Sequence, residues 1–265
     1  MTPAEFALAR HHSYSLLGRL LLEGLTQELW SFVRAVPSLV GPLPDAFDAD
    51  EAAAMYQRLW GFTIFPFESM FLDASGLLGG AVTEQVQATY RHAGFRRGQN
   101  GVSADHVGWQ LHFLAFLSAA EADAWADGLP STAERMCEIQ RSFMRRHLLR
   151  WLMPLGLAVA RQSHPFYRTV MMLTIELATE HYESLADQTQ PAWSLPGAPP
   201  LLSEERTGLR DIATYFTTTP HAGLFLSRDD IGTLARDHGL PRGFGSRQQL
   251  LENLLRSASH YGALP

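Results

Sequence analysis

Apolar residues recur at three- and four-residue steps along nearly the whole chain, which is the spacing of one buried face of an α-helix. In residues 4–23, for example, Phe6, Tyr14, Leu17 and Leu21 fall on one stripe. The same pattern predicts further helices over residues 50–60, 84–93, 104–119, 165–185, 204–216 and 228–237, with others after Thr26, Ser131 and Ser246. No convincing run of alternating residues indicates a sheet, so the predicted fold class is all-α, a helical bundle.

Residues that start or stop helices stand near the ends of these segments. The predicted N-terminal caps are Thr26, Ser227, the capping-box pair Ser131 and Glu134, and the capping-box pair Ser246 and Gln249. Gly24 offers a stop, and Pro165 suits a first turn. Residues 37–44 are predicted to form a loop, and Pro154 is expected to end or kink the helix that carries Trp151. The almost wholly apolar helix over residues 104–119 should be central.

The chain divides at a proline-rich segment. Residues 191–200 hold four prolines and a glycine, a composition typical of a linker or an extended strap. We therefore predict one helical domain over residues 1–190, a linker over residues 191–200, and a helical C-terminal extension over residues 201–265. The extension is either separate or packed on the same domain.

The charges exclude several classes of chemistry. All 21 basic residues are arginines, so the chain has no phosphate-binding Gly-Lys-Ser/Thr loop, no Schiff-base lysine and no kinase-type lysine. A net charge of −6 argues against general nucleic-acid binding, which depends on a basic face. A cationic partner suits this chain better.

The sequence predicts a cytoplasmic protein without stable membrane insertion. Glu5 stands where a secretory signal would carry a positive charge. The longest apolar stretch, residues 152–160, is shorter than the ~20 residues that cross a bilayer. The single cysteine, Cys137, excludes an intrachain disulfide and fits a reducing compartment.

Two short segments carry the most specific pattern. Residues 66–73 read Pro-Phe-Glu-Ser-Met-Phe-Leu-Asp in a predicted loop, and Asp105-His106 opens the apolar helix. A third segment follows on a later helix. The residues that fit a known signature are Pro66, Ser69, Phe71, Leu72 and Asp73, then Asp105, His106, Leu111, Phe113 and Leu114, then Phe143, His147, Leu148 and Trp151.

Together these segments resemble the signature of the TorD/DmsD/NarJ family, chaperones that hold molybdenum-containing redox enzymes for cofactor insertion and export. Three positions depart from the family pattern. Ser103 replaces a proline, Gln110 replaces a glutamate, and Phe67 replaces a tryptophan or tyrosine.

The resemblance implies a cytoplasmic binding protein rather than an enzyme. Its client would be the apo form, or the twin-arginine leader, of a molybdopterin-containing catalytic subunit. The chaperone itself would be a monomer or homodimer with no catalytic residue, no metal and no cofactor beyond transient contact with molybdopterin guanine dinucleotide or a guanine nucleotide. The peptide-binding residues implied are Phe67, Glu68, Ser69, Phe71, Asp73, Asp105, His106, Trp109 and Gln110.

Within that site, Asp105 would pair with a guanidinium of the leader, and His106 would titrate in the physiological range. We expect both residues to lie in the exposed first turn of a helix that Ser103 caps. A plainer interpretation remains open, in which the pair is an ordinary helix start and the aromatic residues around Phe67 simply enter the core.

Two other classes of function also remain open. One is a helical enzyme or sensor that binds a nucleotide or metal through its histidines, although these lack metal-ligand spacing and His147 suits a packed core. The other is a DNA-binding regulator that uses the C-terminal helical hairpin.

Overall fold

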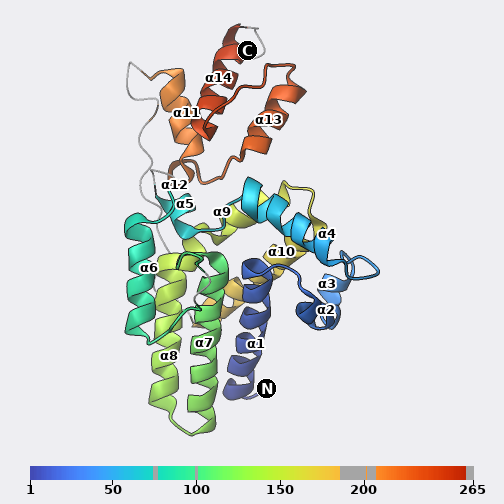
Figure 1. Cartoon of the computed structure of the whole chain (residues 1–265). Coiled ribbons are helices and arrows are strands. Elements are labelled where there is room, and N and C mark those ends of the chain that lie inside the picture. The colour runs from blue at the N-terminus through green and yellow to red at the C-terminus, as the bar shows by residue number, and fades with distance from the viewer. Residues whose placement is uncertain (74–76, 99–100, 186–200, 202–206, 261–265) are drawn as a thin grey trace.

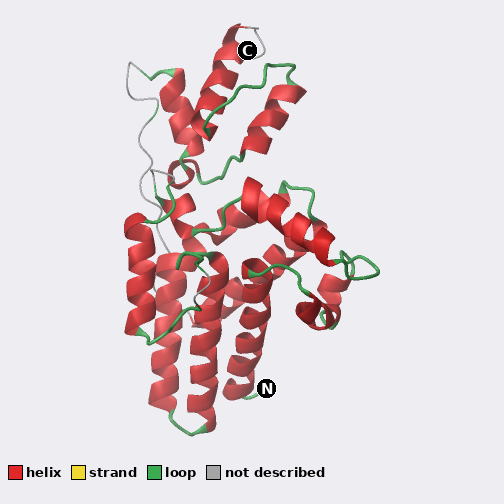
Figure 2. Cartoon of the chain, viewed as in Figure 1, coloured by secondary structure: helices red, strands yellow, loops and turns green. Residues whose placement is uncertain are grey.

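The computed structural model describes residues 1–73, 77–98, 101–185, 201 and 207–260, and these residues fold as helices and loops without a strand (Figure 2). The predicted all-α class is confirmed. The helices labelled in Figure 1 are α1 (Pro3–Leu22), α2 (Gln27–Arg34), α3 (Pro37–Val40), α4 (Ala49–Tyr56), α5 (Glu68–Leu72), α6 (Gly80–His92), α7 (Val107–Ala126), α8 (Pro130–Phe143), α9 (Leu149–Ala160), α10 (Pro165–Leu185), α11 (Leu209–Thr217), α12 (Thr219–Ala222), α13 (Arg228–Asp237) and α14 (Arg247–His260). Two π-helical turns, η1 (Gln57–Thr63) after α4 and η2 (Met144–Leu148) between α8 and α9, complete the order.

Helix α7 is the centre of the bundle, as its sequence predicts. It runs beside α1 on one side and α8 on the other (Figure 1). The α1–α7 approach is close because glycines face each other: a β-carbon added at Gly108 would lie 2.8 Å from the carbonyl oxygen of Gly18. Buried apolar residues of α7, among them Leu111, Phe113 and Leu114, fill the common core. Helix α7 has no polar face because it is buried on nearly every side.

Most of the predicted helix ends are confirmed. Thr26 and Ser227 cap α2 and α13 through their side chains, and Ser246 and Gln249 exchange hydrogen bonds at the start of α14. Gly24 follows α1 with a φ of +83°, a conformation that suits glycine. These ends depend on residues close in sequence, which is why local pattern predicts them.

Two predictions about helix ends are wrong, and at Pro154 one of the two predicted outcomes is excluded. Ser131 does not cap α8, because the helix already begins at Pro130. Residues 37–44 are not all loop, since Pro37 starts the short helix α3. Pro154 lies inside α9 rather than ending it. The π-helical turn η2 already interrupts the backbone ladder before α9, and the buried residues Trp151, Leu152 and Leu155 hold α9 in the core beyond the proline.

The C-terminal segment packs on the bundle through α12, which contacts α5, and through contacts of Phe225 and Asp230. Helices α11, α13 and α14 form small apolar clusters of their own, above α5 and α9 in Figure 1. Phe225, in the loop before α13, instead joins the main core and stacks on Phe71 with 4.9 Å between ring centroids. Arg161, which follows α9 as its C-cap, donates to the carbonyl of Phe225 and pairs with Asp230 at 3.3 Å. The proposed linker at residues 191–200 lies outside the described residues.

Across the described residues, no helix combines the length and the apolar character needed to span a membrane.

Candidate functional site

The two signature segments meet in the structure. Residues 67 and 106 form an isolated antiparallel bridge, in which the amide of Glu68 donates to the Asp105 carbonyl at 2.9 Å and the amide of Val107 donates to the Pro66 carbonyl at 2.9 Å. The rings of Phe67 and His106 contact edge to face at 4.9 Å. The predicted loop is therefore a short extended piece followed by helix α5, held against the start of α7.

The buried side chain of Asp105 links these two segments by hydrogen bonds. Its side chain is fully buried and accepts hydrogen bonds from the Ser69 amide at 2.9 Å and the Ser103 hydroxyl at 2.5 Å. The Ser69 amide is one of the first-turn donors of α5 that have no partner within the helix. The expected exposed position of Asp105 is wrong, and so is the expected role of Ser103, which binds Asp105 instead of capping α7.

His106 is the N-cap of α7. Its Nδ1 accepts a hydrogen bond from the Gly108 amide at 3.0 Å, which places the ring proton of the neutral form on Nε2. Burial lowers the pKa of His106 to about 3, and the neighbouring Asp105 only partly opposes this shift. The expectation that His106 titrates in the physiological range is therefore wrong, because the buried imidazole stays neutral there.

A second set of buried polar groups surrounds Glu68. Gln110 donates from Nε2 to Glu68 Oε2 at 2.5 Å, and the Trp151 indole donates to Gln110 Oε1 at 3.2 Å. Because an indole N–H can only donate, Trp151 fixes the orientation of the Gln110 amide. His147 Nδ1 lies 3.1 Å from Glu68 Oε1. Burial raises the pKa of Glu68, while the contacts with His147 and Gln110 act in the opposite direction.

We call this set, Glu68, Gln110, His147 and Trp151 together with Asp105, the buried junction. These contacts explain why a glutamine replaces the family's glutamate at position 110. A glutamate there would place a second carboxyl group against Glu68 in a buried environment, whereas the glutamine supplies the N–H that the Glu68 carboxylate accepts. His147 is a buried histidine, as its sequence context suggested, but it is bound to a carboxylate rather than packed only among apolar groups.

The structure brings Phe67, Glu68, Ser69, Asp105, His106 and Gln110 together, whereas the ring of Trp109 contacts Arg97 and His112 instead, and little of the nine predicted peptide-binding residues is exposed. Phe67 and Asp73 are half-buried, and the buried members are Glu68, Ser69, Phe71, Asp105, His106, Trp109 and Gln110. Phe71 lies in the core between Trp151 and Phe225. In this conformation the contacts of Glu68, Ser69, Asp105 and Gln110 hold α5 and the start of α7 together, and the assignment of the set to peptide binding stays a prediction.

An open apolar pocket lies elsewhere, where α2, α4 and the loop between α3 and α4 meet the start of α10. It encloses about 310 Å³, and its lining residues are Leu25, Trp30, Pro42, Leu43, Pro44, Phe47, Asp48, Glu51, Ala52, Met55 and Phe166. Trp30 and Phe47 contact each other with ring centroids 5.6 Å apart. A neighbouring hollow of about 480 Å³ shares Leu25, Phe47 and Ala52 and adds Glu23.

We call these two hollows the acidic-rimmed pocket, because the carboxylates of Glu23, Asp48 and Glu51 line an otherwise mainly apolar surface. Asp48 and Glu51 are exposed, and Asp48 also caps α4. No motif in the sequence marked this pocket. Its residues come from separate elements and have the ordinary spacing of helix faces, so only the tertiary structure assembles them.

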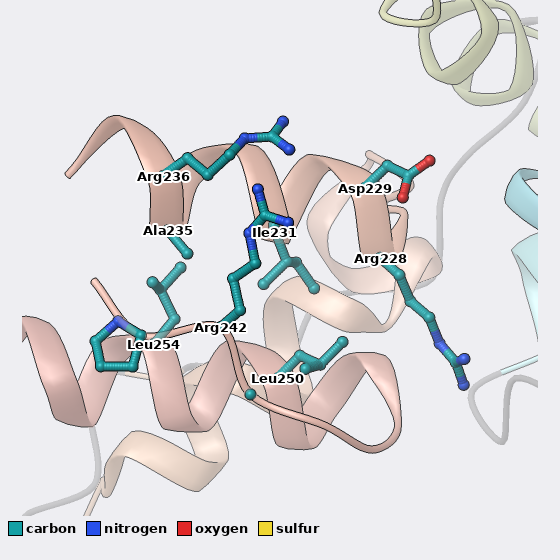
Figure 3. Close-up of a pocket in the computed structure, with 11 residues that line it drawn as sticks. Arg228, Asp229, Ile231, Ala235, Arg236, Arg242, Leu250 and Leu254 are labelled. Atoms are coloured by element: carbon teal, nitrogen blue, oxygen red, sulfur yellow. The ribbon is translucent and has the colours of Figure 1, made fainter. Parts of the chain in front are cut away.

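The C-terminal segment holds a pocket of about 460 Å³ between α13 and α14 (Figure 3). Ile231, Leu250 and Leu254 contribute apolar surface, and the guanidinium groups of Arg236 and Arg242 lie near each other, whereas Arg228 points away from them. Residues 207–260 carry six arginines and five carboxylates. This near-neutral balance gives the segment little excess of positive charge, on which general nucleic-acid binding depends.

Other chemistry finds little support in the described residues. Among them, no group of three or more histidine, cysteine or carboxylate side chains is arranged to hold a metal ion. Burial raises the pKa of the Cys137 thiol to about 12, so it remains protonated and is a poor nucleophile.

Comparison with known proteins gives one informative result. A search of curated proteins finds no match. The model of the family described as "Nitrate reductase delta subunit" matches residues 21–155, a span that contains all three signature segments and the acidic-rimmed pocket except Phe166. This span is just over half of the 265 residues. The chain therefore belongs to the nitrate reductase delta subunit family, whose members are maturation chaperones of molybdenum-containing enzymes.

Proposed function

We propose that this chain is a cytoplasmic, system-specific chaperone of one molybdopterin-containing oxidoreductase. It binds the leader peptide or the apo form of the catalytic subunit, assists cofactor insertion and delays export until the cofactor is loaded. The chaperone performs no chemistry itself. Membership of the family supports the general role, and one feature of the surface supports the mode of binding.

That feature is the acidic-rimmed pocket. Its aromatic and methionine side chains, Trp30, Phe47 and Met55, are half-buried and therefore partly available to a ligand. Methionine and aromatic surfaces adapt to varied apolar partners, and exposed carboxylates attract arginine. A peptide with an apolar stretch beside a basic pair, as in a twin-arginine leader, has the complementary pattern. The net charge of −6 also favours encounter with a basic segment.

In this proposal the buried junction stabilises the fold and does not bind the leader. Its polar groups are bound to one another, so it offers few donors or acceptors to a ligand. It fixes α5 against α7 inside the bundle. We therefore place the leader in the acidic-rimmed pocket and treat the signature residues as the structure that stabilises the fold around it.

Co-purification tests the proposal directly. A tagged copy of the full chain, expressed in its own host, should retain the catalytic subunit of a molybdoenzyme, identified by mass spectrometry. A peptide with the N-terminal sequence of that subunit should then bind in calorimetry, and the same peptide with its two arginines changed to glutamines should bind more weakly. Recovery of no molybdoenzyme subunit, or equal affinity for both peptides, would contradict the proposal.

A further inference from the structure

The pocket between α13 and α14 differs from the acidic-rimmed pocket in the charge at its rim. It encloses about 460 Å³, and its charged lining residues are Arg228, Arg236, Arg242 and Asp229. Arginines therefore outnumber carboxylates here, although the net charge of the whole chain is −6. We call it the arginine-rimmed pocket. It lies outside residues 21–155, so the family match gives it no function.

The floor of the arginine-rimmed pocket is apolar and only partly covered. Ile231 of α13 is buried, whereas Leu250 and Leu254 of α14 are half-buried and line the pocket (Figure 3). These side chains belong to the two small apolar clusters of the C-terminal segment, which leave part of both leucines in contact with water. Removal of that apolar surface from water by a partner is favourable.

An exposed phenylalanine adjoins the same pocket. Phe244 follows the lining residue Gly243 in the loop between α13 and α14, and it is 96% exposed. This loop lies close against α14, since a β-carbon added at Gly243 would lie 3.3 Å from the side-chain nitrogen of Asn253 and 3.5 Å from a methyl of Leu250. Single exposed apolar residues are common, but this ring stands on a loop that also lines an apolar floor. Aromatic side chains of this kind are enriched at protein interfaces.

The guanidinium groups of Arg236 and Arg242 lie near each other in this pocket (Figure 3). Both residues are exposed, Arg236 in the last turn of α13 and Arg242 in the loop that follows. Arg236 also donates to the hydroxyl of Thr233 at 2.8 Å, a neutral acceptor that helps to hold its side chain in place. Two like charges close together repel, and both attract a carboxylate placed between them. Because hydrogen bonds between guanidinium and carboxylate groups are also stronger than neutral ones, the rim favours a carboxylate.

From this arrangement we infer that the arginine-rimmed pocket is a docking site for a segment of a partner protein that carries carboxylates beside large apolar side chains. The apolar side chains cover the leucines of the floor and Phe244, and the carboxylates bind Arg236 and Arg242. A twin-arginine leader has the opposite charge and is disfavoured here. Nucleic acid matches the arginines but not the apolar floor. The inference goes beyond leader binding and does not depend on it, because both the site and the charge of the occupant differ.

Photo-crosslinking of the full chain in its own host tests the inference. The photoreactive amino acid p-benzoylphenylalanine replaces Phe244, whose exposed ring can be changed without loss of the fold. Mass spectrometry identifies the cross-linked peptide, which should belong to another protein and hold apolar residues beside an excess of carboxylates. The double variant Arg236→Glu/Arg242→Glu should reduce the adduct about tenfold, because like charges then face each other. The matched control is Arg91→Glu/Arg135→Glu, two exposed arginines on α6 and α8, which should leave the adduct unchanged.

A synthetic peptide with the cross-linked sequence then gives the affinity. It should bind the unmodified full chain in isothermal titration calorimetry. The same peptide with its carboxylates changed to amides should bind about tenfold more weakly, because the charge-assisted contacts are lost. Phe244→Ala should also weaken binding, about fivefold, through loss of the aromatic contact.

Each outcome decides the question. Absence of an adduct would overturn the inference, and so would an adduct confined to this chain, to a second copy, to nucleic acid or to a basic segment. An adduct that persists in the folded Arg236→Glu/Arg242→Glu variant, or that is lost equally in the control, would also overturn it. Circular dichroism reports folding, and Arg242→Gln, a change in an exposed loop, replaces the double variant if that variant unfolds. All these variants should bind the leader normally, so failure of this test is distinguishable from failure of the proposed function.

Discussion

The buried junction and the acidic-rimmed pocket both contain carboxylates beside aromatic rings, but they differ in exposure. In the junction, Asp105 is fully buried and Glu68 is 1% exposed, and both are bound by internal donors. In the pocket, Asp48 and Glu51 are exposed beside the half-buried ring of Trp30. The first arrangement holds the chain together, and the second offers charge to a partner.

The comparison shows that the residues that identify the family are not the residues that are exposed to a partner. The marker residues Asp105, His147 and Trp151 lie in the interior among mutually satisfied polar groups, where loss of one partner is costly. The pocket residues carry no marker, because many apolar and acidic side chains could serve. Substitutions in the junction should therefore change the free energy of unfolding, and substitutions in the pocket should change affinity.

The largest effect is expected for Asp105→Ala. The change leaves the Ser69 amide and the Ser103 hydroxyl without their carboxylate acceptor, at a cost of about 4 kcal/mol in the free energy of unfolding. Urea denaturation followed by circular dichroism measures it. Asp123→Ala, an exposed carboxylate on α7, is the control and should change stability by less than about 0.5 kcal/mol. Equal stability of the two variants would show that the junction does not hold the fold.

The sequence predicts the fold better than it predicts the site. Helix positions follow from periodicity, and caps such as Thr26 and Ser227 act within three residues of their partners. The family resemblance also groups residues 67 and 106 in one predicted site, and the bridge between them shows that the two residues lie side by side. Exposure is different, because it depends on distant residues. Phe71 is covered by Phe225, far along the chain, and no local pattern contains that information.

The next effect concerns the contact between the C-terminal segment and the bundle. Phe225→Ala should cost about 3 kcal/mol, because it opens a cavity beside Phe71 in the main core. Phe244→Ala removes the same ring in the same segment, but this side chain is 96% exposed and its loss should cost almost nothing. Thermal unfolding measures both. If the two variants melted alike, the C-terminal segment would not contribute to the core.

A third prediction uses pH to test the burial of His106. In the unfolded chain this histidine binds a proton near its ordinary pKa of 6.5, whereas in the folded chain the pKa is about 3. The unfolded state therefore binds more protons between these values, and stability falls as the pH falls. Relative to His106→Asn, which can still cap α7, the unmodified protein should lose roughly 2 kcal/mol between about pH 8 and about pH 5.

Denaturant unfolding of both proteins at a series of pH values gives this difference, and groups common to both cancel. A constant difference across the series would mean that His106 titrates alike in the folded and unfolded chains. The imidazole would then be exposed to water, and the junction would be open enough for a ligand to contact it.

The smallest effects are expected in the acidic-rimmed pocket, and there they should appear in affinity alone. Met55→Ala removes apolar surface from the wall, and Glu51→Gln removes an exposed charge from the rim. Each should weaken binding of the client leader by about 1 kcal/mol, about fivefold, with little change in melting temperature. Met172→Ala and Glu138→Gln, exposed positions on α10 and α8, are the matched controls and should bind normally. Suppose that the pocket variants bind the leader normally and that a folded Phe67→Ala variant binds it more weakly. The leader would then bind at the signature residues and not in the acidic-rimmed pocket.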